Sequence, residues 1–176
     1  IKKELRNKNQ FCHGSVMFRK ECLKKTGAYR PQFKSSQDYD LWLRISEFWD
    51  VTNLREPLYK LRVCLQSISV ANKFDQDRYA LLARILAEER RKTGKDRLQG
   101  LKDGEIEIML EQMLPKNRYN ERKSLAGGYS HCAVLFYEAG NCAEAKKWLM
   151  KSLQHRLFSV SNWKLFMKIM WKHNLK

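Results

Sequence analysis

Two carboxylates, Asp38 and Asp40, stand at the start of a predicted helix, where their type and spacing suit acid–base chemistry. Ser35-Ser36 precedes them and offers N-caps to a helix that begins at Gln37. Apolar residues then recur at helical spacing, namely Leu41, Ile45 and Phe48. A helix N-terminus favours the ionised form of a carboxylate, which is the form that a general base needs. The alternative interpretation is that both residues merely occupy a first turn in which acidic side chains are common.

Other groupings of reactive side chains give weaker evidence of a functional site. Cys12-His13 and His131-Cys132 could together form a zinc site, but the chain has no Cys-x-x-Cys pair and the two dipeptides lie far apart. Five cysteines, odd in number and scattered, indicate reduced thiols and not a disulfide framework. There is also no Gly-x-Ser-x-Gly elbow and no phosphate-binding loop.

The elements that would position Asp38 lie in the first part of the chain, up to about residue 72. This part alternates short strand-like and helix-like segments with turn residues between them. Strands are predicted at 14–19, 51–54 and 58–63, and helices at 20–25 and from residue 37. Gly27 is predicted to end the first helix.

From Asp75 onward the pattern is almost continuously helical. A long amphipathic helix is predicted at 75–92, a linker at 93–104, a further helix at about 105–114, and two or three more from Leu125. The apolar stripe of the long helix consists of Tyr79, Leu82, Ile85 and Leu86.

Four blocks of the first part together resemble one known family. They are 13–19 (His-Gly-Ser-Val-Met-Phe-Arg), 27–33 (Gly-Ala-Tyr-Arg-Pro-Gln-Phe), 37–44 (Gln-Asp-Tyr-Asp-Leu-Trp-Leu-Arg) and 56–62 (Glu-Pro-Leu-Tyr-Lys-Leu-Arg). In order and approximate spacing, residues 9–72 resemble the C-terminal, acceptor-side half of a glycosyltransferase family 2 catalytic domain.

The resemblance implies an α+β fold, mostly helical, in which residues 1–92 form the acceptor-side part of a GT-A-like domain. It implies an inverting enzyme that moves a sugar from a nucleotide-diphosphate donor to a hydroxyl of a glycan or lipid-linked acceptor. Asp38 aligns with the family's general base. The positions expected to bind substrate are His13, Arg19, Gln37, Asp40, Trp42 and Arg62. For His13 and Arg19, a structural histidine and a surface cation are equally good interpretations.

Three departures from the family pattern affect what is expected. Gln37 replaces the more frequent Glu beside the base, and Cys64 stands where many members carry a metal-binding His. Cysteine is a poor ligand for Mg²⁺ or Mn²⁺. The donor-binding half with its Asp-x-Asp motif does not precede Asp38. The chain is therefore expected to be an inactive fragment of a longer enzyme that would use a divalent metal, with no metal expected in this fragment.

The helical part resembles a tetratricopeptide repeat. Small and aromatic residues at the repeat's positions predict a helix ending near Gly140 and a second from Ala143. Ser152 replaces a usual small apolar residue, and a single repeat needs neighbouring helices for stability. Residues 105–176 are thus predicted to form an all-α domain.

The net charge of +16 is spread over both parts, with an excess of +10 in the first hundred residues and +6 after them. Such charge is also typical of a basic helical-repeat module that binds nucleic acid or protein, but no nucleic-acid module is recognisable. The segment 163–171 alternates apolar residues with lysines, which suits either an interfacial membrane helix or a packed helix with a solvated lysine face. The expected location is cytoplasmic, with possible peripheral contact at the anionic inner face of the membrane.

Overall fold

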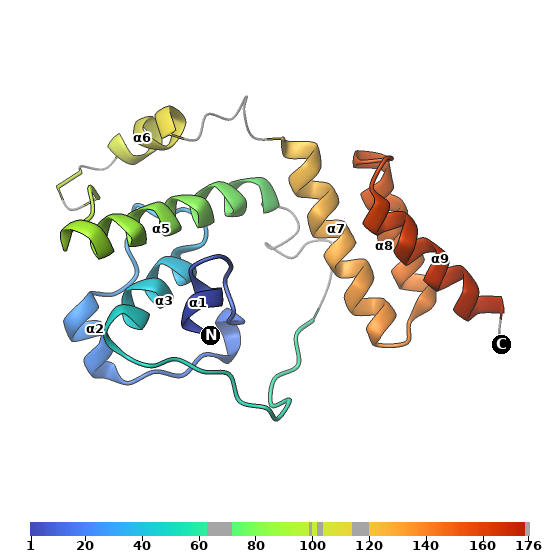
Figure 1. Cartoon of the computed structure of the whole chain (residues 1–176), viewed down its shortest axis with the longest axis horizontal. Helices are drawn as coiled ribbons and strands as arrows, with labels where there is room; N and C mark the ends of the chain where they lie inside the picture. The colour runs from blue at the N-terminus through green and yellow to red at the C-terminus, as the bar shows by residue number, and fades with distance from the viewer. Residues whose placement is uncertain (63–71, 99, 102–103, 114–119, 175–176) are drawn as a thin grey trace. The chain divides into compact units, whose positions relative to one another are not determined.

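The computed structural model describes residues 1–62, 72–98, 100–101, 104–113 and 120–174 (Figure 1). These residues form two compact units. The first comprises Ile1–Leu61 and Asp75–Arg118, and the second comprises Arg62–Phe74 and Tyr119–Lys176.

The first unit is built around α3 (Gln37–Phe48) and α5 (Lys73–Thr93), which lie with the shorter helices α1 (Lys2–Leu5), α2 (Lys20–Thr26) and α6 (Glu105–Met113). A 3₁₀ turn, η1, covers His13–Ser15. Its core brings together apolar side chains of α3, α5 and α6, including Leu41, Ile45, Leu82, Leu86 and Leu110. The predicted helices at 20–25, 75–92 and 105–114 are confirmed to within a few residues.

One glycine fixes the end of α2, and one serine fixes the start of α3. Gly27 ends α2 with a φ of 76°, and its N–H donates to the carbonyl of Leu23 at 2.9 Å, as predicted. Ser36 stands at the N-cap position of α3 but does not cap it with its side chain. Its backbone is left-handed, with a φ of 55°, and its hydroxyl donates to the carbonyl of Gln76 at 2.9 Å. Ser36 therefore ties the start of α3 to α5.

None of the described residues lies in a strand. The strand predictions at 14–19 and 51–54 are not met, nor is the described portion of 58–63. A strand is stable only when a neighbouring strand satisfies its N–H and C=O groups, and the described residues offer no such partner. The relation to a GT-A-like fold stays a prediction.

The predicted boundary between the two parts is corrected by the core contacts. Ile106 and Leu110 of α6 are 3% and 2% exposed within the core of the first unit, so α6 belongs there and not to the second unit. Asp96 and Leu98, in the segment predicted as a linker, are also buried. Their side chains anchor this segment, because burial of an apolar residue and a paired carboxylate leaves little freedom to the backbone.

The second unit contains α7 (Glu121–Glu138), α8 (Cys142–His155) and α9 (Val160–Asn174). Helices α7 and α8 form the predicted hairpin, reversed at Gly140, whose φ is 79° (Figure 1). Buried Ser152 links all three helices, since its hydroxyl contacts the carbonyl of Ala126 and the side-chain amide of Asn162, each at 2.7 Å. A hydroxyl at this position is therefore paired within the core and not a defect.

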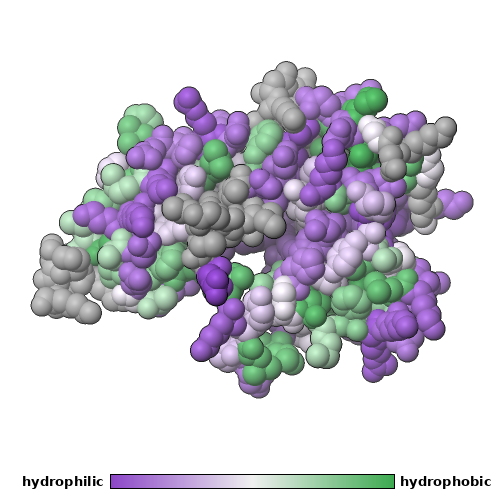
Figure 2. Space-filling view, turned by 180° about the vertical axis from the view of Figure 1, so that it is seen from behind, coloured by the Kyte–Doolittle hydropathy of each residue, from purple (hydrophilic) through white to green (hydrophobic). Residues whose placement is uncertain are grey.

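On the face shown in Figure 2, hydrophobic residues lie in groups among more numerous hydrophilic ones. Within the described residues, no helix combines the length and apolar character needed to cross a membrane.

Buried Tyr39 provides a test of how α1 is held to α3. Its hydroxyl donates to the carbonyl of Leu5 at 2.6 Å, and burial raises the pKa of Tyr39 to about 12. The folded state therefore favours the neutral phenol, and this stabilisation is complete below the unfolded pKa of about 10 and lost as the pH rises toward 12. We expect Tyr39→Phe to cost about 1 kcal/mol at neutral pH.

In the same variant, the free energy of unfolding should fall less steeply at alkaline pH than it does in the wild type. Denaturant unfolding at a series of pH values between neutrality and strong alkali measures both effects. Lysines titrate in the same range in both proteins, so the difference between the two curves isolates Tyr39. If the two plots of unfolding free energy against pH stay parallel, the phenol of Tyr39 does not contribute to the alkaline loss of stability.

Candidate active site

Asp38 reaches the surface from the first turn of α3. Its side chain is 18% exposed, and one carboxylate oxygen, Oδ2, accepts a hydrogen bond from the side-chain amide of Asn9 at 3.3 Å. The amide oxygen of Asn9 in turn accepts from the backbone N–H of Phe11 at 3.1 Å, which fixes the amide. Asp38 is thus held from one side while part of its carboxylate remains accessible.

His13 lies beside this carboxylate and connects it to Tyr29. Nδ1 of His13 is 4.0 Å from Oδ2 of Asp38, and Nε2 is 3.2 Å from the Tyr29 hydroxyl. Burial and, after it, the negative charge of Asp38 raise the pKa of Tyr29 above its ordinary value. The phenol therefore stays protonated at neutral pH and is able to donate to His13.

Aromatic rings surround this group, and we call them the aromatic cluster: Phe11, His13, Phe18, Tyr29 and Trp42. Trp42 of α3 is 3% exposed and lies at its centre, with ring centroids 5.5 Å from Phe18, 6.3 Å from His13 and 6.5 Å from Phe11. Its indole N–H is buried and has no hydrogen-bond partner among the described residues. The cluster places a largely apolar surface beside one part-exposed carboxylate, and small-molecule sites commonly combine such groups.

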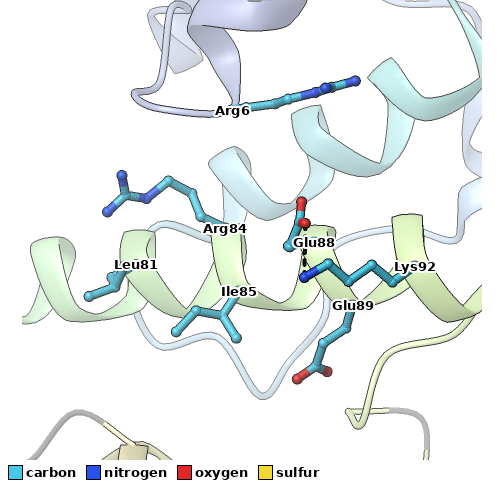
Figure 3. A pocket seen from close by; sticks show the side chains of 7 residues that line it. All are labelled: Arg6, Leu81, Arg84, Ile85, Glu88, Glu89 and Lys92. Carbon is cyan, nitrogen blue, oxygen red and sulfur yellow. Dashed lines mark ion pairs between the residues drawn. The ribbon is translucent and has the colours of Figure 1, made fainter.

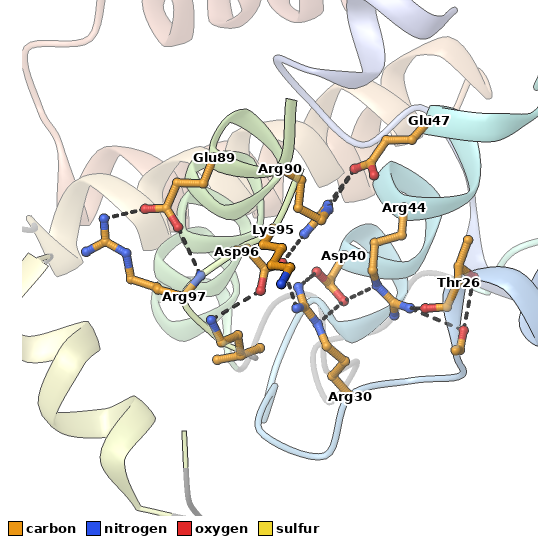
Figure 4. Close-up of polar contacts among 12 residues, drawn as sticks. Thr26, Arg30, Asp40, Arg44, Glu47, Glu89, Arg90, Lys95, Asp96 and Arg97 are labelled. Atoms are coloured by element: carbon orange, nitrogen blue, oxygen red, sulfur yellow. Dashed lines mark hydrogen bonds and ion pairs between the residues drawn. The ribbon is translucent and has the colours of Figure 1, made fainter. Parts of the chain in front are cut away.

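Asp40, two residues further along α3, has the opposite environment. Its carboxylate is fully buried and accepts hydrogen bonds from Arg44 Nε at 3.0 Å and from Arg30 Nε at 2.9 Å (Figure 4). Arg30 Nη2 also contacts its other oxygen. With both oxygens occupied by guanidinium groups, Asp40 has no free surface to offer a substrate. We assign it a structural role in place of the predicted substrate contact.

The same ion pairs continue into α5 and the segment after it. Arg30 Nη1 lies 2.8 Å from the buried carboxylate of Asp96, which also pairs with Arg90. Arg90 in turn pairs with Glu47 of α3 at 2.8 Å (Figure 4). Burial raises the pKa of Asp96, but the charges and hydrogen bonds of Arg30 and Arg90 outweigh it and hold the pKa below its ordinary value.

We call these six side chains the buried ion network: Arg30, Asp40, Arg44, Glu47, Arg90 and Asp96. Three guanidinium groups match three carboxylates, so the network carries no net charge. It joins the loop after α2, helix α3, helix α5 and the loop after α5, and so fixes the start of α3 from which Asp38 projects.

The remaining predicted residues are dispersed. Gln37 is half-buried at the first position of α3, and Arg19 is exposed at the N-cap of α2. Arg62 is exposed and belongs to the second unit. Cys64 lies outside the described residues.

The structure adds residues that the sequence did not single out. Tyr29 and Phe18 fall inside the blocks that carry the family resemblance, so the pattern contained a signal for them. Asn9 had none, because nothing in a single sequence relates it to a carboxylate 29 positions away.

No metal site is formed by the described residues, among which no three His, Cys, Asp or Glu side chains are grouped so as to hold an ion. Asp38 and His13 supply at most two ligands. This part of the chain does not fit a divalent metal, and we derive no step through one.

A separate pocket lies on the outer side of α5 and is closed at one edge by Arg6 (Figure 3). Its acidic side chains are already paired. Glu88 pairs with Arg91 at 2.6 Å and with Lys92 at 3.3 Å, and Glu89 pairs with Arg97. Arg91 and Lys92 lower the pKa of Glu88 to about 2. None of the predicted site residues lines this pocket, and we assign it no chemistry.

Comparison with curated proteins relates part of the chain to a glycosyltransferase. The chain is 40% identical over 76 residues to the O-antigen biosynthesis glycosyltransferase WbnJ of Escherichia coli. The matched residues are 43% of this chain and 28% of that protein, so the chain spans little more than a quarter of the length of this relative. No protein-family model and no solved structure matches the chain.

Proposed function

We propose that this chain supplies the acceptor side of an inverting glycosyltransferase of family 2, with Asp38 as the general base. The relative named above supports glycosyl transfer in polysaccharide synthesis. The observation that carries the finer proposal is the contrast between two neighbouring carboxylates. Asp40 is fully buried between two guanidinium groups, whereas Asp38 is part-exposed within the aromatic cluster.

The chemistry follows from the position of Asp38. As an acceptor hydroxyl oxygen attacks the anomeric carbon of the donor sugar, its proton passes to the Asp38 carboxylate, and the bond to the nucleotide diphosphate breaks with the electron pair leaving on the diphosphate. Transfer of the proton during attack makes the oxygen a stronger nucleophile. The donor in this proposal is a nucleotide-diphosphate sugar.

His13 and Tyr29 would orient the acceptor and the base. A neutral His13 that accepts from the Tyr29 hydroxyl at Nε2 carries its proton on Nδ1, the nitrogen that faces Asp38. The exposed faces of Tyr29 and Phe18, which are 43% and 37% exposed, offer apolar contact to the C–H face of a sugar ring.

Steady-state measurement of sugar transfer by the full-length transferase proposed here tests the proposal. Tyr29→Ala should raise the KM for the acceptor about tenfold and leave the KM for the donor unchanged, because the ring contacts only the acceptor. Tyr29→Phe keeps the ring and should recover most of the acceptor affinity. Phe48→Ala is the matched control, since it removes a ring that is 54% exposed and outside the aromatic cluster.

Three results would contradict the proposal. A higher KM for the donor in Tyr29→Ala would place the cluster on the donor side. Equal effects of Tyr29→Ala and Phe48→Ala would indicate a general loss of stability. Absence of transfer from every nucleotide-diphosphate sugar, together with steeply salt-dependent binding of random DNA, would favour the basic binding module instead.

A further inference from the structure

Helix α9 has two apolar faces, and only one of them is buried. Leu165 and Ile169 are at most 9% exposed and pack within the second unit, next to the buried side chain of Asn162. The opposite side carries Val160, Trp163, Met167 and Trp171, which are 71%, 44%, 65% and 73% exposed. At 3.6 residues per turn these four side chains fall within about 80° of the helix circumference, centred roughly opposite Ile169.

The turn before α9 extends this surface. Leu157 and Phe158 are 56% and 89% exposed. The indole N–H of Trp163 donates to the carbonyl of Leu157 at 2.8 Å, which holds the turn against the first coil of α9. We call these six residues the α9 outer face: Leu157, Phe158, Val160, Trp163, Met167 and Trp171. Contiguous exposed apolar surface of this kind marks an interaction site.

Positive charge accompanies the apolar residues. Lys164 and Lys168 are exposed on the flank of the α9 outer face, about 40° and 80° from Val160 around the helix. From residue 145 to residue 176 the sequence has eight basic residues and no acidic one. They are Lys146, Lys147, Lys151, Arg156, Lys164, Lys168, Lys172 and Lys176.

We propose that the α9 outer face docks on the surface of an anionic lipid bilayer. An interfacial helix places Trp and aliphatic side chains at the boundary of headgroups and acyl chains, while flanking lysines attract lipid phosphates. A second copy of the chain is a poor occupant, because it would bring two equally basic surfaces together. Nucleic acid would use the lysines but would leave the apolar residues uncovered. The inference does not depend on the proposed transferase activity.

Co-sedimentation of the whole 176-residue chain with vesicles tests this inference. We expect binding to vesicles of equal parts phosphatidylcholine and phosphatidylglycerol, little binding to phosphatidylcholine alone, and a loss at high salt. A basic residue near an anionic bilayer strengthens binding about fivefold, so Lys164→Gln with Lys168→Gln should weaken it roughly 30-fold. Met167→Ser with Trp171→Ser should weaken it at least about tenfold, since both side chains would leave the interface.

Two control variants match these substitutions, the first in charge and spacing and the second in apolar character and exposure. Lys20→Gln with Lys24→Gln removes two exposed lysines four residues apart on α2. Leu54→Ser with Ile108→Ser removes two apolar side chains that are 70% and 61% exposed. Both controls should bind like the wild type, and circular dichroism of each variant shows that its helices are retained.

Other outcomes would overturn the proposal. Equal binding to neutral and anionic vesicles, no binding at low salt, or the same loss in the α2 lysine control would each exclude docking through α9. Concentration-dependent self-association that disappears in Met167→Ser with Trp171→Ser would show that the face joins two copies of the chain. Binding of DNA that depends on Lys164 and Lys168, but not on Met167 and Trp171, would show a polyanion site.

Discussion

Asp40→Asn should lower the free energy of unfolding of the first unit by about 3 kcal/mol, near the lower end of the range for breaking a buried ion pair. The substitution keeps the size of the side chain and removes its charge. Arg30 and Arg44, whose side chains are 17% and 6% exposed, would then face each other without the carboxylate that separates them. Two like charges next to each other in a poorly solvated site are costly.

Other contacts of the two arginines explain why the expected loss is not larger. Arg44 also donates to the backbone carbonyls of Thr26 at 2.5 Å and Ala28 at 2.8 Å, and Arg30 keeps its pairing with Asp96. Burial already lowers the pKa of Arg44, with Asp40 opposing that effect. Removing Asp40 would therefore destabilise the charged guanidinium without freeing it from its carbonyl partners.

Hydrogen exchange followed by mass spectrometry can locate this effect. Amides of α3 and α5 should exchange faster in Asp40→Asn, while those of α7, α8 and α9 should not change, because these helices belong to the second unit. Asp38→Asn is the matched control on the same turn of α3. Its carboxylate is part-exposed and accepts one long hydrogen bond, so its loss should cost less than about 1 kcal/mol. Equal losses in the two variants would mean that the buried ion network does not stabilise the fold.

The helices were predictable because their signals are local. The apolar stripe at Tyr79, Leu82 and Leu86 is buried as its spacing requires, and a glycine ends α2 where its freedom to take a positive φ is needed. The hairpin of α7 and α8 follows from small residues at the helix crossing, of which Ala133 and Ala145 are fully buried. Each of these patterns lies within a few turns of helix, where sequence spacing and spatial neighbourhood coincide.

The different burial of the two carboxylates was not predictable from the sequence, although the family resemblance distinguished Asp38 as the expected base. Asp38 and Asp40 occupy the same first turn, and only distant residues decide which one is buried. Arg44 is four positions from Asp40 and gave a local hint, but Arg30 is linked to Asp96 across 66 positions. Asp96 lies between polar residues of a segment that reads as a linker, and no pattern in a single sequence shows that two arginines bury it.

In the full-length transferase proposed above, Asp38→Asn should reduce kcat for sugar transfer by about 10²- to 10⁴-fold. The amide keeps the shape of the side chain and its hydrogen bond with Asn9 but has no basic oxygen to take the acceptor proton. Donor affinity should stay nearly unchanged, because proton transfer occurs only during attack of the hydroxyl.

The neighbouring carboxylate supplies the contrast that makes this result specific. Asp40→Asn should lower the amount of folded protein, and each folded molecule should retain transfer within a few-fold of the wild type. Asp38→Asn should do the reverse and leave the unfolding free energy almost unchanged. A wild-type kcat in Asp38→Asn would move the base to another residue. An equal loss of kcat in both variants, with stability unchanged in both, would mean that both carboxylates of this turn take part in the reaction. Burial of Asp40 would then not exclude it from catalysis.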